Sequence, residues 1–264
     1  MFLLDYVEEL QTKGKLWFNK VEAQQALSCT ELAITKAVER LVKKKKIVTL
    51  KSDFIFIVPV EYKTWGVVPA DWFIDPLMQY LSIPYYIGLL TAASYYGAAH
   101  QKPQIFQVVS NQRIESMTRN RVRVKFYNNQ ELLRTPTQKI QVRTGYMQIS
   151  TPEATALDLI KYYRVCGYLS NVATVLSELK EEIQVGKLLE LMQKNIYDFA
   201  ILQRFGYLMS LADVDGYELV KDLEALIAKA KPRFVPLQPG TEYSIKSRNE
   251  IWRLYINEEI EVDQ

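Results

Sequence analysis

Apolar residues recur at helical spacing in three consecutive stretches at the amino-terminal end of the chain. Residues 1–13 predict a first helix, and Asn19 is a good cap for a second helix over residues 20–27. After a brief turn, Thr30 opens a third helix that is expected to end near residue 43. One face of this third helix is apolar. It comprises Ala33, Ile34, Ala37, Val38, Leu41 and Val42.

The pattern then changes from helical spacing to two short β-rich runs, residues 46–50 and 54–58. Polar residues 51–53 join them, which is typical of a hairpin. Three helices followed by a hairpin predict a winged helix-turn-helix domain over residues 1–62, a module that inserts one helix into the DNA major groove. The candidate base contacts lie on the polar face of the third helix: Thr30, Thr35, Lys36 and Arg40. The candidate phosphate contacts are Lys43, Lys45 and Lys51.

Residues 61–69 read as a connector into a second domain, which we place at 63–264. Its first part, 63–150, mixes helices and strands. Asp71 is expected to cap a helix that runs to about residue 81, and residues 85–97 predict an almost wholly apolar helix. Residues 105–110 are β-rich, and a strand is expected over 119–126.

Cations alternate with apolar residues along 119–126 and again along 139–143. If these are neighbouring strands of one antiparallel sheet, one face of that sheet carries a basic stripe. The stripe would comprise Arg119, Arg121, Arg123, Lys125, Lys139 and Arg143. Two interpretations stay open. The stripe is either a solvated face whose charges discourage edge pairing, or a second surface for nucleic acid or an acidic partner.

Ser150-Thr151-Pro152-Glu153 is a strong helix start, with a hydroxyl cap and a proline in the first turn. Further helices are expected near 169–184, 185–195, 197–212 and 215–231, and a strand over 251–256. The part 151–264 is therefore mainly helical with a terminal strand. The fold class follows as α+β: a winged helix-turn-helix and then a larger mixed domain with a helical carboxyl-terminal part.

Charge is distributed unevenly along the 264 residues, whose net charge is only +3. Residues 30–51 carry seven lysines and arginines against two glutamates, and residues 151–264 are net acidic. Nucleic acid should therefore meet the amino-terminal part of the chain. Two distant cysteines and the early charged residues predict a cytoplasmic protein without a signal peptide, membrane span or structural zinc site.

The sequence offers little for catalysis. The lone His100 has no nearby partner and is expected to pack or cap, and no glycine-rich phosphate loop is present. Asp158 is expected to stabilise its helix, and Glu178 to lie at the surface. We therefore expect no enzyme activity, no cofactor and no metal.

Three segments together resemble the AbiEi family, the antitoxins of type IV toxin–antitoxin (abortive infection) systems that serve antiviral defence. They are the amino-terminal module, the stretch YYIGLLTAASYYGAAH at 85–100, and STPEATALDLI at 150–160. The resemblance implies a repressor that binds inverted repeats in its own promoter through its winged helix. It also implies that the second domain counters a nucleotidyltransferase toxin. The hairpin here has no glycine at its tip, which departs from many such modules.

The sequence therefore predicts a DNA-binding autorepressor that is also an antitoxin. Its binding partner would be double-stranded operator DNA, and the toxin would be a functional partner, with direct contact between the two proteins left open. It would be a monomer or weak dimer that binds DNA cooperatively. The alternative is a protein-interaction module that neutralises its partner by direct contact, without reading DNA sequence.

Overall fold

The structure is a computed structural model that describes residues 2–51, 53–98, 103–194, 196–212 and 218–262. Its contacts separate two units. Unit 1 comprises Met1–Tyr86, Gln104–Leu132 and Lys139–Gln148. Unit 2 comprises Ile87–Pro103, Leu133–Gln138 and Ile149–Gln264. The chain combines helices with several sheets, so the predicted α+β class is confirmed at this level.

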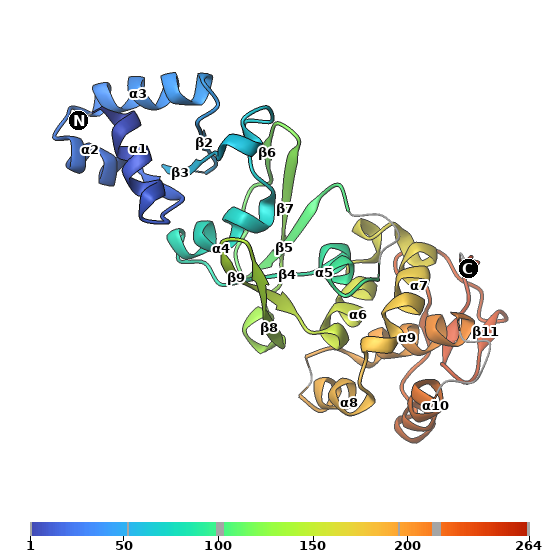
Figure 1. The fold of residues 1–264 in the computed structure, drawn as a ribbon. Helices are drawn as coiled ribbons and strands as arrows, with labels where there is room; N and C mark the ends of the chain where they lie inside the picture. The colour runs from blue at the N-terminus through green and yellow to red at the C-terminus, as the bar shows by residue number, and fades with distance from the viewer. Residues whose placement is uncertain (1, 52, 99–102, 195, 213–217, 263–264) are drawn as a thin grey trace. The chain divides into compact units, whose positions relative to one another are not determined.

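The first part of unit 1, which we call the N-terminal module (residues 3–57), has three helices and three short strands (Figure 1). The helices are α1 (Leu3–Thr12), α2 (Lys20–Leu27) and α3 (Glu31–Lys43). The strands are β1 (Trp17–Asn19), β2 (Ile47–Thr49) and β3 (Phe54–Ile57), paired in the antiparallel order β1-β3-β2. Their apolar faces share one core, which includes Val7, Leu10, Phe18, Ile34, Val38 and Ile55. The helices and the two hairpin strands lie where the sequence predicts them.

After η1 (Val60–Tyr62), unit 1 continues with α4 (Ala70–Tyr80). The expected cap at Asp71 is wrong, because Pro69 precedes the helix and Asp71 lies in its first turn. An acid there still interacts favourably with the helix dipole. Asp75 accepts a 2.7 Å hydrogen bond from the hydroxyl of Tyr85. Burial, together with this carboxylate, raises the pKa of Tyr85.

A six-stranded mixed sheet has the order β6-β7-β5-β4-β9-β8. Its strands are β4 (Tyr85–Ile87), β5 (Phe106–Ser110), β6 (Met117–Arg119), β7 (Val122–Asn128), β8 (Thr137–Val142) and β9 (Gly145–Ser150). β5 pairs with β7 in parallel, whereas β6 pairs with β7 antiparallel. The N-terminal module shares unit 1 with β5, β6 and β7, so the predicted domain division at residue 62 stays a proposal.

Two predicted elements of this region are wrong. The helix expected over 85–97 begins as strand β4, with Ile87 paired to Ile149 of β9, and only α5 (Leu89–Tyr95) is helical. The strand expected over 119–126 is two strands, because Asn120 adopts a left-handed backbone (φ 51°) and turns the chain between β6 and β7. In the first place pairing with a distant strand outweighs the local pattern. In the second, a tight turn at residues 120–121 folds the chain back on itself, so that Arg119 pairs with Val122.

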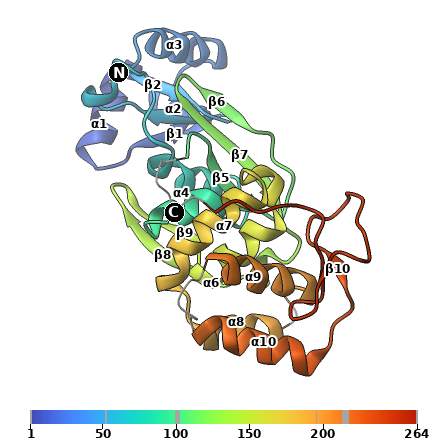
Figure 2. The same ribbon diagram turned by 90° about the vertical axis from the view of Figure 1, so that its right-hand side faces the viewer.

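Unit 2 is mainly helical beyond residue 150, as predicted. Its longer helices are α6 (Pro152–Lys161), α7 (Tyr168–Leu179), α8 (Val185–Gln193), α9 (Phe199–Ala212) and α10 (Glu218–Ala230). Short 3₁₀ turns are η2 (Leu132–Arg134), η3 (Tyr163–Val165) and η4 (Lys180–Glu182). Figure 2 shows α6, α7 and α9 packed together. The predicted helix ends at residues 195 and 215 lie outside the described residues.

A small sheet closes unit 2, with β10 (Val235–Pro236), β12 (Leu254–Tyr255) and β11 (Arg248–Asn249) in that order. Only the last part of the strand expected over 251–256 is therefore a strand. Trp252, which is 1% exposed, packs onto α9 at Gly206, where a Cβ would lie 2.0 Å from the indole ring. Within the described ranges, no helix is both long and apolar enough to span a bilayer.

Candidate nucleic-acid interface

Side chains cap the starts of both α2 and α3. Asn19 accepts a 2.8 Å hydrogen bond from the backbone N–H of Glu22, whose side chain returns to the Asn19 N–H in a capping box. Ser28 ends α2 in a left-handed conformation (φ 48°), and Thr30 caps α3 by accepting from the N–H of Ala33 at 3.3 Å. The turn between the helices is therefore as tight as the sequence predicts.

The inward face of α3 is narrower than expected. Ile34, Val38 and Leu41 are buried, whereas Ala33 and Val42 are exposed, so their predicted inward position is wrong. Ala23 of α2 is fully buried, which allows the helices to pack closely. A stripe of three residues at i, i+4 and i+7 is enough to seat a short helix on a small core.

The outward face of α3 carries the predicted base contacts. Thr30, Lys36 and Arg40 are exposed, and Thr35 is half-buried. Two of these groups already serve the helix, because Thr30 is its cap and the Arg40 Nε donates to the Lys36 carbonyl at 3.2 Å. Both retain further donors. The face therefore offers hydroxyl and guanidinium groups to solvent along about three turns of helix.

The predicted phosphate contacts differ in how their ammonium groups are engaged. Lys43 is exposed in the last turn of α3. The Lys45 Nζ donates to the Thr64 carbonyl at 2.8 Å, and the Lys51 Nζ to the Glu115 carbonyl at 3.3 Å. Ser52, beside Lys51 in the hairpin loop, lies outside the described residues. Sequence reasoning could not have found these carbonyl partners, which are distant along the chain.

The six cations of the expected basic stripe do not lie on neighbouring strands. Arg119 ends β6, Arg121 lies in the β6–β7 turn, and Arg123 and Lys125 project from β7. Lys139 lies on β8 at the opposite edge of the sheet, and Arg143 follows that strand. The assumption of one antiparallel sheet with these strands adjacent is therefore wrong.

Two of these arginines hold unit 1 together. The Arg119 guanidinium donates to the carbonyls of Thr49 and Leu50, both at 2.8 Å, which ties the β6–β7 hairpin to the β2–β3 hairpin. Arg143 pairs with Glu61 at 2.8 Å and lies 4.5 Å over the ring of Trp72. Lys125, by contrast, is an exposed cation 5.5 Å from the ring of Tyr127.

A clamp around Trp65 was not foreseen from the sequence. Asn120 Nδ2 donates to the Trp65 carbonyl at 2.6 Å, next to the Lys45–Thr64 bond. Gly66 between them has φ 67°, and a Cβ there would lie 3.2 Å from both Asn120 Nδ2 and Lys45 Cγ. The tryptophan and glycine were visible in the sequence, but their partners lie 20 to 55 residues away.

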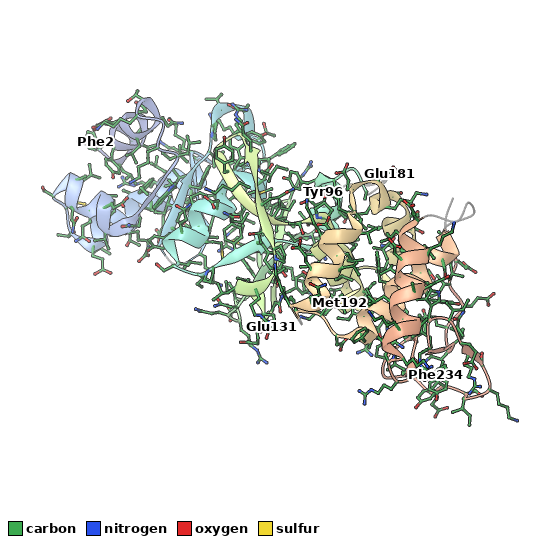
Figure 3. The ribbon with its side chains drawn as sticks, turned by 90° about the horizontal axis from the view of Figure 1, so that it is seen from below. Phe2, Tyr96, Glu131, Glu181, Met192 and Phe234 are labelled. Carbon is green, nitrogen blue, oxygen red and sulfur yellow. The ribbon has the colours of Figure 1, made fainter. Side chains whose placement is uncertain are left out.

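Several polar groups around α6 of unit 2 are buried. On α6, Asp158 is fully buried and accepts a 3.0 Å hydrogen bond from Tyr197. This carboxylate stabilises the fold through a tertiary contact, not as an acid near the start of its helix as predicted. Ser150 and Thr155 hydroxyls lie 2.6 Å apart, and Tyr96 donates to the Ser150 carbonyl at 2.5 Å. Burial raises the pKa of Tyr96 to about 12, and its position is seen in Figure 3.

The described part of the chain holds no group of three or more histidines, cysteines or acids that could together ligate a metal ion. His100 lies outside the described residues. Glu178, expected at the surface, has a side-chain oxygen that is buried at the end of α7.

Comparisons with known proteins bear on both the fold and the second part of the chain. The crystal structure of the RV2827C protein from Mycobacterium tuberculosis is similar, with a TM-score of 0.64 and 15% identity over 94% of this chain and 89% of that one. At this identity the likeness concerns the fold alone. No curated protein matches the sequence.

Residues 86–211 match the family described as the AbiEi antitoxin C-terminal domain. The matched range begins at β4 and extends through α9, so it includes the buried polar groups around α6. The match bears out the resemblance to the AbiEi family and supports an antitoxin role for this part of the chain.

Proposed function

We propose that this protein is a DNA-binding autorepressor and an antitoxin, with residues 1–62 as a winged helix-turn-helix and residues 63–264 as the antitoxin domain. The observation that carries the first half is the outward face of α3. Its inward residues are buried, while Lys36, Arg40 and Lys43 are exposed beside a tight turn and a hairpin. This is the arrangement with which such modules enter the major groove.

The contacts divide into two classes. Arg40, with Thr30, Thr35 and Lys36, is placed to reach base edges, because these groups lie along the exposed side of the helix. Lys43 should make the strongest phosphate contact, because the ammonium groups of Lys45 and Lys51 each already donate one hydrogen bond to a protein carbonyl. An ammonium has three donors, so both still add positive charge and hydrogen bonds at the backbone.

The antitoxin half rests on the family match over residues 86–211. We propose that this domain counters a nucleotidyltransferase toxin without catalysing a reaction of its own, and that it acts in the cytoplasm. The free thiols Cys29 and Cys166 fit a reducing compartment. Two copies would bind inverted repeats cooperatively, as monomers or weak dimers in solution.

Promoter binding by two variants tests the DNA-binding half. Arg40→Ala should lose about 1–3 kcal/mol of affinity for the promoter duplex and discriminate less against a scrambled duplex. Lys43→Ala should weaken binding to both duplexes alike and lower the slope of log K against log salt by about 0.9. If neither change alters promoter binding, the protein-interaction alternative is correct instead.

Co-purification with the adjacent toxin tests the alternative, neutralisation by direct contact. Arg123→Ala and Lys125→Ala are the suitable probes of the exposed β7 cations, because Arg119 is needed to hold the β2–β3 hairpin. Loss of toxin capture in these variants, with promoter binding intact, would favour direct contact through the sheet. Unchanged capture would exclude β7 as the toxin surface.

A further inference from the structure

Trp65 is a large aromatic side chain that is only partly buried in unit 1. It is 47% exposed, although the neighbouring Val67 and Val68 are fully buried. Tyr62 meets its ring edge-on at 5.8 Å, and the Arg121 guanidinium lies 5.9 Å over the ring centroid. The indole therefore presents part of its surface to solvent, with a cation held beside it.

The surroundings of Trp65 are fixed from two sides. Lys45 binds the Thr64 carbonyl and Asn120 binds the Trp65 carbonyl, with Gly66 where a side chain would crowd both. These bonds join the turn after α3 to the tip of the β6–β7 hairpin. Arg119, directly before the turn of that hairpin, adds two hydrogen bonds to the Thr49 and Leu50 carbonyls at the end of β2. The β6–β7 tip is thus attached to the DNA-binding module itself.

Positive charges gather where the turn after α3 and the β6–β7 tip meet the Trp65 segment. The turn after α3 contributes Lys43 to Lys46, and the hairpin tip contributes the exposed Arg121. A cation stacked on an exposed indole beside a lysine-rich helix end suits a phosphodiester backbone, with the guanidinium binding phosphate and the ring contacting sugar or base. Figure 1 shows the β6 end of this hairpin next to β2.

The geometry points to a second DNA contact: the β6–β7 tip, through Arg121 and Trp65, binds the backbone of the duplex that flanks each half-site read by α3. The hairpin acts as an additional wing beside β2–β3. This inference rests on the proposed function, since it needs α3 in the groove. It commits to duplex DNA, because the contact is continuous with the lysines at the end of α3.

The test compares a long promoter duplex with one trimmed to its half-sites, for the wild type, Arg121→Ala and Trp65→Ala. The wild type should lose roughly tenfold in affinity on trimming, the loss of one charge-assisted contact. Arg121→Ala should bind the long duplex more weakly than the wild type does, and trimming should cost it less than it costs the wild type, because only the Trp65 contact is then left to lose. Its salt slope on the long duplex should fall by about 0.9. Trp65→Ala should show the same loss on the long duplex with an unchanged salt slope.

Arg233→Ala is the matched control, because it removes an exposed arginine from unit 2 and should behave as the wild type on both duplexes. Thermal melting of each variant checks that both exposed side chains are removed without unfolding. Equal losses on trimming for the wild type and Arg121→Ala would overturn the inference. A defect confined to single-stranded oligonucleotides would overturn it as well.

The experiment also separates this contact from the proposed function. Arg40→Ala should weaken binding to the long and the trimmed duplex equally, because α3 reads the half-site in both. If Arg40→Ala is defective and Arg121→Ala is not, the second contact is wrong and the repressor function stands. If the wild type prefers neither promoter duplex over scrambled DNA, the function itself fails.

Discussion

Helices α3 and α6 start alike and end up in opposite surroundings. A threonine caps each of them, Thr30 for α3 and Thr151 for α6. On α3 only three of thirteen residues are buried and its charges face solvent, whereas eight of the ten residues of α6 are buried, two of them acids. A polar side chain on α3 is available to a partner, and one on α6 is part of the fold.

This difference shows that charge alone does not identify a binding residue. Glu153 of α6 is 1% exposed and accepts a hydrogen bond from the Gln184 N–H at 3.1 Å, and Asp158 accepts from Tyr197. Arg119 is a cation on the surface, yet its guanidinium binds three carbonyls of its own chain. Substitutions should therefore separate into those that change stability and those that change DNA binding.

The largest effect is expected on α6. Leu157→Ala removes a fully buried side chain and should lower the free energy of unfolding by about 2–5 kcal/mol, because the cavity does not close completely. Chemical denaturation followed by circular dichroism measures the loss. Promoter affinity at a temperature where the variant is folded should not change. A loss of affinity as large as that of Arg40→Ala would show that the two regions are not separable in function.

The two capping threonines give a matched pair with a smaller effect. Thr30→Ala and Thr151→Ala should each cost about 0.5–2 kcal/mol of stability, since each leaves a backbone N–H without its acceptor. Only Thr30→Ala should also weaken promoter binding. Thr30→Ser and Thr151→Ser keep the hydroxyl oxygen and should retain most of the stability. Equal binding by Thr30→Ala and the wild type would remove Thr30 from the interface.

The helices and caps of both regions follow from local sequence. Asn19, Thr30 and Thr151 cap the helices that the spacing predicts, because a cap needs only the N–H groups of the next turn. The predicted apolar face of α3 was too wide, because Ala33 and Val42 are apolar but lie exposed outside the core.

The wrongly predicted elements have two causes, a distant pairing and a tight turn. Residues 85–87 form a strand because Ile87 pairs with Ile149, 62 residues away, and nothing local reveals that pairing. The turn at Asn120 breaks a regular alternation that reads as one strand. The clamp on Trp65 and the fork of Arg119 join segments far apart in the chain, so the sequence alone could not predict either.

The smallest effect concerns the two thiols, Cys29 in unit 1 and Cys166 in unit 2. Cys166 is fully buried, and burial next to Asp158 raises its pKa to about 12, whereas Cys29 is half-buried in the turn before α3. The thiolate is the reactive form and is populated only as the pH approaches the pKa. At pH 8 the native protein should therefore give one fast-reacting thiol with a disulfide reagent, at Cys29, and the second only on unfolding. Two fast thiols would contradict the buried position of Cys166.

Lysine footprinting on promoter DNA addresses the role of α3 most directly. The protein is reductively methylated with and without the promoter duplex, and each lysine is quantified by mass spectrometry. DNA should protect Lys36 and Lys43 and leave Lys187 and Lys229, which are exposed on helices of unit 2, equally modified in both samples. Full modification of Lys36 and Lys43 in the presence of a bound duplex would show that α3 does not enter the groove.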